Sequence, residues 1–578
     1  MISTSGDRTG GQRRRPRLLH LALVAAVGLA ACGGDDDATI DTTGDSAATP
    51  TRATSDSPSS TEPTASTVGA TEATTAPAPA TDPGAAPTTA TGEEPVTGGS
   101  AEYLTQGELT GTFDPAKILA VATVLTDGTA GYLVYGALVV ANPDTFEVDP
   151  MMAESLTTED GMLWTLKLRE GVTFSDGTPY DAEAVKYNWD RHADPEVTSR
   201  SASVAALIAA MEVVDPQTLE ITLKDTNFQF NRSVAQNGHN FIASPAALEA
   251  GTIDESPVGA GPFILEEWQR DDHMTFVRNP DYWDAPRPYI DEVTLRPVLD
   301  DSQRLNTASS GQAVGMVIQN HAGAARGEEM GLEARHNSLS GGNSMYFNLE
   351  SPVAGDLRFR QAMRLAIDNQ LLNDIVDQGN GPETIGFFAQ NSPFYDPAND
   401  YPARDVAGAQ ALIDEIAAEQ GGPVTFTLLV SATQAGIGDA LQAQLAELDN
   451  LEMNLEVAAV GIPTQKMIEG SYEVSLYSNY SLDPEPQLGS LLQTGSPRNF
   501  MRYSNPEMDE LIAAGRSTQD EAERRDVYVR MAALLNEDIP MLTFSRTDPT
   551  ILYNGDVLKN LSFFQDGIIH WESAWLES

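Results

Sequence analysis

The chain of 578 residues has a single thiol, Cys32, and its position suits a covalent modification. It follows an apolar run, residues 18–31, in which His20 is the one polar side chain. The thiolate of a cysteine is a good nucleophile toward a lipid donor, and a lone cysteine has no partner for a disulfide. The fold must therefore be stabilised by its own apolar core, which a chain of this length can form.

Residues 1–31 have the layout of an export signal. Four arginines between residues 13 and 17 precede the apolar run, which ends in small residues and is too short to cross a bilayer as a helix. The sequence Leu29-Ala30-Ala31-Cys32 resembles the lipobox of bacterial lipoproteins, in which the cysteine is lipidated and becomes the first residue. We expect residues 1–31 to be a lipoprotein signal peptide. The alternative is an ordinary signal peptide that contains a cysteine without a role.

Catalytic and metal-binding motifs are absent from the sequence. The seven histidines are scattered, with no His-Glu-x-x-His pair, and no Gly-x-Ser-x-Gly or Gly-x-x-x-x-Gly-Lys-[Ser/Thr] segment occurs. We therefore expect no metal and no cofactor, and a binding protein rather than an enzyme. An exported hydrolase stays an alternative, because a catalytic pair of carboxylates could not be recognised among 84 acidic residues.

The charge of the chain excludes whole classes of partner. Residues 1–31 hold five Arg and one Asp, so the chain from Cys32 onward keeps 29 basic and 83 acidic residues, a net charge of −54. Such an acidic surface is repelled by nucleic acid and by anionic lipid. Attachment to the outer face of the cytoplasmic membrane would then depend on acyl chains at Cys32.

Residues 32–100 have the composition of a tether rather than of a folded domain. Thr, Ala, Pro and Ser dominate this segment from residue 35, and aromatic residues are absent. Such a segment cannot bury enough apolar surface to offset the entropy lost on ordering. As a flexible coil it has a root-mean-square reach of roughly 45 Å, enough to lift a domain off a membrane.

The folded part is expected to begin near residue 101 and to combine strands with helices. Apolar and polar residues alternate over 166–174, which predicts two half-buried strands. Asp176-Gly177 predicts a turn after them. The helical spacing of apolar residues over 182–189 then predicts a helix that is capped by Asp181.

A strand–helix–strand unit is predicted further along the chain. Alternation over 424–430 and again over 453–459 flanks a helical spacing over 437–448. One crossover helix between two strands implies a parallel pair, and ligands of such sheets bind at the carboxyl ends of strands or between lobes. The segment 505–507 (Asn-Pro-Glu) predicts another helix start, and a long helix is expected over about 520–536.

Nine short segments, in order, carry a resemblance to one protein family. They are 152–156 (MAESL), 164–169 (WTLKLR), 171–179 (GVTFSDGTP), 259–263 (GAGPF), 278–283 (RNPDYW), 346–349 (YFNL), 357–362 (LRFRQA), 503–509 (YSNPEMD) and 537–540 (EDIP). Together they resemble the peptide- and nickel-type solute-binding proteins of bacterial ABC importers, family 5 of the extracellular binding proteins. The resemblance extends over nearly all of residues 101–578.

The resemblance implies an α/β fold of two lobes, the type II periplasmic-binding-protein or Venus flytrap arrangement, with an extra subdomain in lobe I. Lobe I is expected to take residues 101–338 together with 545–578, and lobe II residues 339–544. The chain then crosses between the lobes twice, an arrangement suited to hinge closure over a ligand.

The resemblance places the ligand where residues 477–484 run from a strand end into a loop. Tyr477, Asn479, Tyr480 and Asp483 are the leading candidates for contact with it. Peptide-binding members carry an aspartate at the position of Tyr480, where it pairs with the α-ammonium group of the peptide. A phenol can accept a hydrogen bond but cannot pair with a cation at neutral pH. Asp483 has an alternative role, because a residue before proline often shapes a loop.

Five further residues complete the predicted site. Arg498 and Asn499 are expected to hold a carboxylate through a guanidinium fork, with a surface salt bridge as the alternative. Asp127 and Tyr132 in lobe I are expected to reach the cleft, as is Asn343 at the crossing between the lobes.

The resemblance also implies the function. A monomer anchored by Cys32 would capture a peptide or peptide-like solute and deliver it to an ABC permease in the membrane, without binding nucleic acid. Alternatives with the same fold are capture of a non-peptide solute, such as an oligosaccharide, an opine-like acid or a chelated metal, and a surface receptor that works without a permease.

Overall fold

The structure, a computed structural model, describes residues 94–107, 111–118, 126–565 and 567–577. Residues 86–578 form one compact unit by their backbone contacts. The predicted signal peptide, Cys32 and the tether up to residue 93 lie outside the described residues. Among the helices that the structure describes, none is long and apolar enough to cross a membrane.

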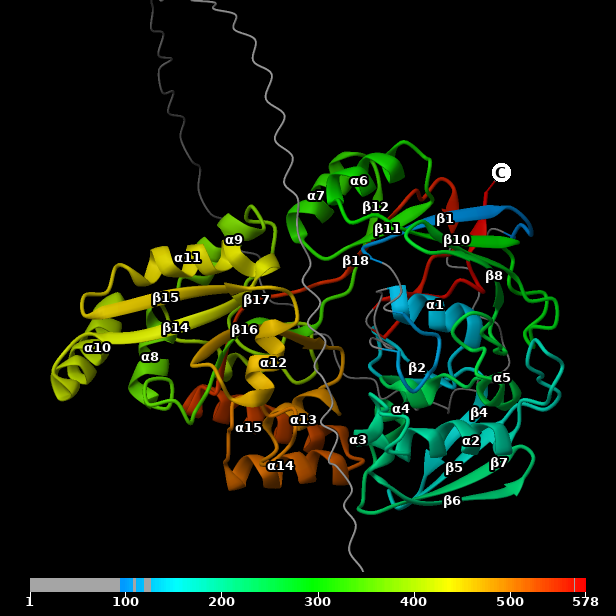
Figure 1. The fold of residues 1–578 in the computed structure, drawn as a ribbon, viewed down its shortest axis with the longest axis horizontal. Coiled ribbons are helices and arrows are strands. Elements are labelled where there is room, and N and C mark those ends of the chain that lie inside the picture. The colour runs from blue at the N-terminus through cyan, green and yellow to red at the C-terminus, as the bar shows by residue number, and fades with distance from the viewer. Residues whose placement is uncertain (1–93, 108–110, 119–125, 566, 578) are drawn as a thin grey trace, which may run out of the picture. The chain divides into compact units, whose positions relative to one another are not determined.

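The first large sheet has seven strands that come from both ends of the folded chain. In spatial order they are β12 (Glu333–His336), β18 (Thr550–Tyr553), β11 (Gly315–Ile318), β1 (Ser100–Thr105), β10 (Glu292–Pro297), β9 (His273–Arg278) and β8 (Phe263–Gln269). β1 pairs in parallel with β10 and β11, whereas the outer pairs are antiparallel. Figure 1 shows β18 (red), from near the C-terminus, in the same sheet as the N-terminal β1 (blue), and β11 lies between the two strands.

Alternating apolar residues of this sheet form a core with the helix α1 (Thr126–Tyr135). Tyr103, Val293 and Leu295 on the strands are fully buried, and so are all ten residues of α1. The helices α6 (Asp301–Ser309) and α7 (His321–Glu329) lie beside β11 and β12 (Figure 1).

A four-stranded antiparallel sheet forms a subdomain attached to this lobe. Its order is β4 (Ala153–Thr158), β5 (Leu163–Leu168), β7 (Thr218–Leu223) and β6 (Ile208–Asp215). The helix α2 (Ala182–Ala193) packs with it and begins as predicted, because the Asp181 carboxylate accepts from the Ala184 N–H at 3.0 Å. The predicted second strand over 172–174 is wrong. The backbone of this segment forms hydrogen bonds with the turn around Asp176-Gly177. Its β-type pairing is limited to one isolated bridge, between Thr173 and Pro179.

The second lobe is built on a five-stranded sheet. Its order is β15 (Leu451–Ala458), β14 (Val424–Ser431), β16 (Val474–Ser481), β13 (Ser340–Phe347) and β17 (Met541–Ser545). β14 and β15 are parallel and are joined by the helix α11 (Ala435–Leu445), which confirms the predicted strand–helix–strand unit. The other predicted helices are confirmed as α14 (Pro506–Ser517), capped by Asn505, and α15 (Glu521–Asp538), capped by Asp520.

Most of the remaining elements are short. The helices are α3 (Ala202–Ala205), α4 (Phe230–Ala235), η1 (Gly238–Asn240), α5 (Pro245–Ala250), α8 (Leu357–Ala366), α9 (Asn369–Val376), η2 (Pro397–Asn399), α10 (Val406–Gln420), η3 (Ala432–Gln434), α12 (Ile462–Glu469) and α13 (Gln487–Leu492). The strands are β2 (Val139–Ala141) with β3 (Val148–Pro150), β19 (Leu558–Lys559) with β22 (Trp575–Leu576), and β20 (Phe563–Phe564) with β21 (Ile568–Ile569).

Two adjacent chain segments connect the two large sheets. One runs from β12 to β13 and the other from β17 to β18. Arg546, in the second segment, donates to four backbone carbonyl groups, those of Gly341, Gly386, Phe387 and Phe388, at 2.5–2.8 Å. These bonds tie the crossing segment to lobe II. A hinge between the lobes therefore has a firmly held end on the side of lobe II.

Candidate functional site

The end of β16 lies where residues of the two lobes meet. β16 pairs antiparallel with β13 and parallel with β14, so its last residues continue from the middle of the lobe II sheet. Tyr477, Asn479 and Tyr480 are half-buried there. The structure thus places three of the predicted residues on one strand end.

Tyr480 contacts the other lobe directly. Its hydroxyl oxygen accepts a hydrogen bond from the side-chain Nε2 of Gln319, which follows β11 in lobe I, at 3.2 Å. Its ring packs against a small apolar cluster of Ala141, Leu339 and Leu482. Tyr480 is therefore a bridge between the lobes as well as a candidate ligand residue.

Asn479 has a side-chain donor without a described partner, whereas the ring of Tyr477 packs inside lobe II. The amide Nδ2 of Asn479 is buried and has no acceptor among the described residues. Buried donors are nearly always satisfied by protein, water or ligand, so this atom is a candidate partner for a bound group. The ring of Tyr477 lies 5.2 Å from that of Tyr346 and 5.5 Å from that of Phe500, so it packs inside lobe II.

Asn343 lies on β13 directly beside this strand end. It is paired in register with Ser478, whose hydroxyl donates to its Oδ1, and its Nδ2 donates to the Ser545 hydroxyl at 3.0 Å. The two glycines before it allow the strands to approach closely. A Cβ on Gly341 would lie 2.2 Å from the Asn479 carbonyl oxygen, and one on Gly342 would lie 2.1 Å from that of Ser545.

Asp483 is the centre of a buried ion cluster. Its side chain is 2 % exposed and accepts from both Nη atoms of Arg524, at 2.6 and 3.0 Å, and from the backbone N–H of Glu485 at 2.9 Å. Arg232, on α4 of lobe I, lies 3.1 Å from it. Burial acts to raise the pKa of Asp483, but Arg524 and then Arg232 outweigh it, so the pKa is lowered. These contacts support the loop-shaping role and add a contact between the lobes.

The side chains of Arg498 and Asn499 form hydrogen bonds with residues close to them in the sequence. Arg498 Nη1 donates to the Gln487 side chain at 2.6 Å. The Asn499 amide donates to the carbonyls of Gln493 and Tyr503, at 3.1 and 2.7 Å, and accepts from the Tyr503 N–H at 3.0 Å. With these bonds Asn499 organises the loop, and Arg498 keeps a guanidinium that is not engaged in an ion pair with any described residue.

Both predicted lobe I residues lie on the buried helix α1. Tyr132 is fully buried in the core of lobe I, where its hydroxyl donates to Glu572 at 2.5 Å and its ring lies 4.9 Å from that of Phe564. Burial and the nearby Glu572 raise the pKa of Tyr132 well above its usual value. Asp127, in the first turn of α1, is 3 % exposed.

The contacts of lobe I with lobe II come instead from residues that the sequence analysis missed. Besides Gln319 and Arg232, Gln236 donates to the Glu485 carbonyl at 2.8 Å, and Gln229 donates to that of Thr518 at 3.1 Å. These side chains lie on α4, next to it or after β11. Three glutamines and one arginine at scattered positions in the chain form no sequence pattern that would mark them as a site.

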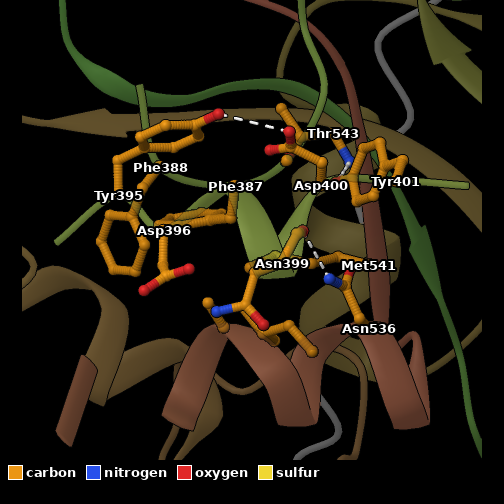
Figure 2. Close-up of a pocket in the computed structure, with 13 residues that line it drawn as sticks. Phe387, Phe388, Tyr395, Asp396, Asn399, Asp400, Tyr401, Asn536, Met541 and Thr543 are labelled. Carbon is orange, nitrogen blue, oxygen red and sulfur yellow. Dashed lines mark hydrogen bonds between the residues drawn. The ribbon is translucent and has the colours of Figure 1, made fainter. Parts of the chain in front are cut away.

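Not every cavity of lobe II has room for a solute. One, shown in Figure 2, is enclosed by aromatic and polar side chains around Asp400 and has a volume of about 20 Å³, close to the space of one water molecule. Tyr395 donates to Asp400 Oδ2 at 3.3 Å, while Oδ1 is buried without a partner among the described residues, which fits a bound water. Within the same ranges no group of three or more His, Cys, Asp or Glu side chains is arranged to hold a metal ion.

Comparison with known proteins places this geometry in a family. Residues 147–499, more than half of the chain, match the model of the bacterial extracellular solute-binding proteins, family 5. Similar curated proteins include the glutathione-binding protein GsiB of Salmonella paratyphi A, 27 % identical over 415 residues, which are 68 % of this chain and 80 % of the relative. GsiB of Shigella dysenteriae is 26 % identical over 409 residues, which are 68 % and 79 % of the two chains.

Solved structures share the fold at lower identity. DppA of Helicobacter pylori in complex with the peptide STSA has a TM-score of 0.71 at 20 % identity, covering 84 % of this chain and 99 % of that one. AgaA of A. tumefaciens R10 with agropinic acid has a TM-score of 0.70 at 22 % identity, covering 83 % and 99 %. NikA of Brucella suis with Fe(III)-EDTA has a TM-score of 0.71 at 21 % identity, covering 83 % and 100 %. Their fold is the two-lobed one described above, with its two large sheets and attached subdomain. The chain belongs to the family 5 extracellular solute-binding proteins of bacterial ABC importers.

Proposed function

We propose that this protein captures a small, peptide-like solute between its lobes at the end of β16 and delivers it to an ABC permease. The observation that carries the proposal is the hydrogen bond of 3.2 Å between Gln319 of lobe I and Tyr480 of lobe II. It brings lobe I onto the strand end at which the family resemblance places the ligand. No step of bond breaking is part of this role, so the proposal is binding and not catalysis.

Closure would work through contacts that exist only when the lobes meet. The side chains of Gln319, Arg232 and Gln236 in lobe I reach Tyr480, Asp483 and the Glu485 carbonyl in lobe II. A solute shifts the balance between open and closed forms only by its difference in affinity for the two. A solute that contacts both lobes at the end of β16 has such a difference, and its capture favours the closed form.

Anchoring at Cys32 belongs to the same proposal. The family acts outside the cytoplasm, and residues 17–32 combine an export signal with a lipobox-like end. The chain beyond Cys32 carries a net charge of −54, so acyl chains are the feature that would hold the protein at an acidic membrane surface. A monomer on a tether of residues 32–100 would then remain within reach of its permease.

The solute class follows from the residue at the end of the strand. Relatives and structural neighbours are named for glutathione, a peptide, agropinic acid and a metal chelate. Tyr480 offers a phenol that cannot neutralise an ammonium group. This favours a solute whose recognition does not depend on a free α-amine, such as a modified peptide or an opine-like acid, with peptides bound through other groups as the second candidate.

Native mass spectrometry of the full exported chain carrying Cys32→Ser tests the proposal. The protein is purified from its producing cell, and the released material is identified after mild denaturation. We expect a bound small molecule, and we expect its removal to expand the particle in small-angle X-ray scattering. A protein that retains no solute and whose scattering does not change with any solute from spent medium or cell extract would overturn the proposed function.

A further inference from the structure

A cavity of about 460 Å³, lined in part by Phe146, opens between the lobes. Its lining residues come from the segments 145–146 and 228–232 of lobe I and 393–394 and 519–525 of lobe II, without Phe230, Asp520 and Glu523. The volume is in the range of small-molecule sites. Phe146 packs against the apolar cluster that also holds Tyr480, so the cavity adjoins the end of β16.

The charged wall of this cavity is unusual for so acidic a protein. Three guanidinium groups line it, those of Arg232, Arg524 and Arg525, against one carboxylate, Glu521. The carboxylates that pair with the arginines, Asp483, Asp396 and Asp526, do not line the cavity. The cavity surface is therefore cationic, while the carboxylates behind it offset that charge. This balance suits a monoanion better than a polyanion.

The arginines are held in place and still have donors to offer. Arg232 is fixed by Gln229 Oε1 at 2.9 Å, by the Phe146 carbonyl and by Asp483, through its Nε and Nη1, and its Nη2 donates to no described residue. Arg525 is held more loosely, by the Tyr395 carbonyl at 3.1 Å and Asp396 at 3.4 Å, and its side chain is 42 % exposed. Fixed guanidinium forks with free N–H groups are the usual partners of a carboxylate.

The rest of the wall is aromatic. Phe146, Phe228 and Phe394 line the cavity, together with Pro393. Phe146 holds a backbone φ of +60°, a conformation that is costly for a bulky side chain and cheap for glycine. Strain of this kind persists where the side chain it positions is useful, and here the side chain forms the wall between the cavity and the Tyr480 cluster.

We propose that this interlobe cavity is a subsite for a carboxylate-bearing, partly apolar end of the solute, held by Arg525 and Arg232 against the ring of Phe146. The inference rests on the proposed function and names the class of solute: an acid whose apolar part lies on the phenyl rings. Since residues from both lobes supply the subsite, an occupant also favours closure.

The test compares two probes that differ in one group, N-acetyl-phenylalanine and its primary amide. Binding to the full chain carrying Cys32→Ser is measured by calorimetry. We expect the acid to bind at least about tenfold more tightly than the amide, and this difference to shrink at high salt. Arg525→Gln should weaken the acid about five- to tenfold and leave the amide unchanged.

A matched arginine on the same helix provides the control. Arg530 is 40 % exposed and pairs with Glu507 and Glu537 outside the cavity, so Arg530→Gln should change neither probe. Phe146→Gly should weaken both probes, because it removes the ring against which they pack while glycine tolerates this φ. Equal binding of acid and amide, no binding of either, or equal effects of Arg525→Gln and Arg530→Gln would overturn the proposal.

The failure of this inference can be told apart from failure of the proposed function. If the purified protein carries a solute without a carboxylate and compacts around it, the subsite is wrong and solute capture stands. If no solute is retained and no compaction occurs, solute capture itself is wrong, whatever the two probes show.

Discussion

Tyr480 presents a phenol, bonded to Gln319 at 3.2 Å, at the position where the resemblance implies an aspartate in peptide-binding proteins. Tyr480→Asp would place a carboxylate at this strand end. We expect it to bind a tetrapeptide with a free α-amine about tenfold more tightly than the N-acetylated form, since hydrogen bonds between charged groups contribute about 1.5–3 kcal/mol. The unmodified protein should not distinguish the two peptides in titration calorimetry.

Tyr480→Asn is the matched control for that change. It removes the ring and the bond to Gln319 just as the aspartate variant does, but it adds no charge. A preference for the free amine in the aspartate variant alone would assign the effect to the charge. The same preference in both variants would show that loss of the ring, and not a new carboxylate, changes which peptides bind.

Arg524 is the residue on which the buried Asp483 most depends. It is 6 % exposed and supplies two hydrogen bonds to that carboxylate. Arg524→Met would leave a buried charge with only Arg232, so we expect unfolding in urea to show a loss of about 3–5 kcal/mol. Arg232→Met should cost less, about 1–2 kcal/mol, because the bidentate partner remains. Equal losses would mean that the bridge between the lobes contributes as much as the pair within lobe II.

At the scale of elements, local patterns predicted those units whose contacts are local. The caps at Asp181 and Asn505 and the parallel pair β14–β15 follow from spacing and side-chain chemistry within about thirty residues. The segment 172–174 alternates as a strand should, yet its backbone bonds into a turn. Alternation reports which side chains are buried, and it does not report where the backbone hydrogen bonds go.

Two elements of the subdomain, α2 and η1, meet through a pair of buried histidines. The rings of His192 and His239 stack at 4.1 Å, and both nitrogens of His239 lack a partner among the described residues. Burial lowers the pKa of His192 to about 4 and that of His239 well below its usual value. A base with a depressed pKa contributes stability above its unfolded pKa of about 6.5, and this is lost as the pH falls toward 4.

We therefore expect the melting temperature to fall between pH 6.5 and 4, and His239→Phe to reduce that dependence. Phenylalanine fills the site without a nitrogen to protonate, and removal of unpaired polar atoms should keep or raise stability at pH 7. His273→Gln is the control, because His273, the first residue of β9, lies outside the subdomain and pairs with Asp272. An unchanged acid dependence in His239→Phe would place the acid-sensitive group elsewhere.

At the scale of the whole molecule, the site could be predicted only in part. Tyr480 and Asn479 were found because one strand end carries them. Gln319, which bonds to Tyr480, and Arg232, which pairs with Asp483, come from chain segments more than 150 residues away. Tyr132 was expected at the cleft and packs in the core of lobe I. Contacts between two lobes join residues that are far apart in the chain. They therefore produce no regular residue spacing by which the sequence of either lobe would reveal them.

A further contact between the lobes should make the proposed closure depend on pH. His321, at the start of α7 in lobe I, lies 3.4 Å from Asp377 of lobe II and 3.3 Å from Asp548 on the crossing segment. Burial acts to lower the pKa of His321, but the two carboxylates outweigh it and raise the pKa to about 9. A raised pKa stabilises the contact fully below about pH 6.5, and this contribution is lost as the pH rises through 9.

Solute affinity, measured by calorimetry at pH 7 to 10, should therefore fall in the unmodified protein and stay flat, at a lower value, in His321→Gln. His336→Gln, at an exposed histidine 3.9 Å from Glu328, should retain the fall; a flat profile in the unmodified protein would show that this contact does not take part in closure.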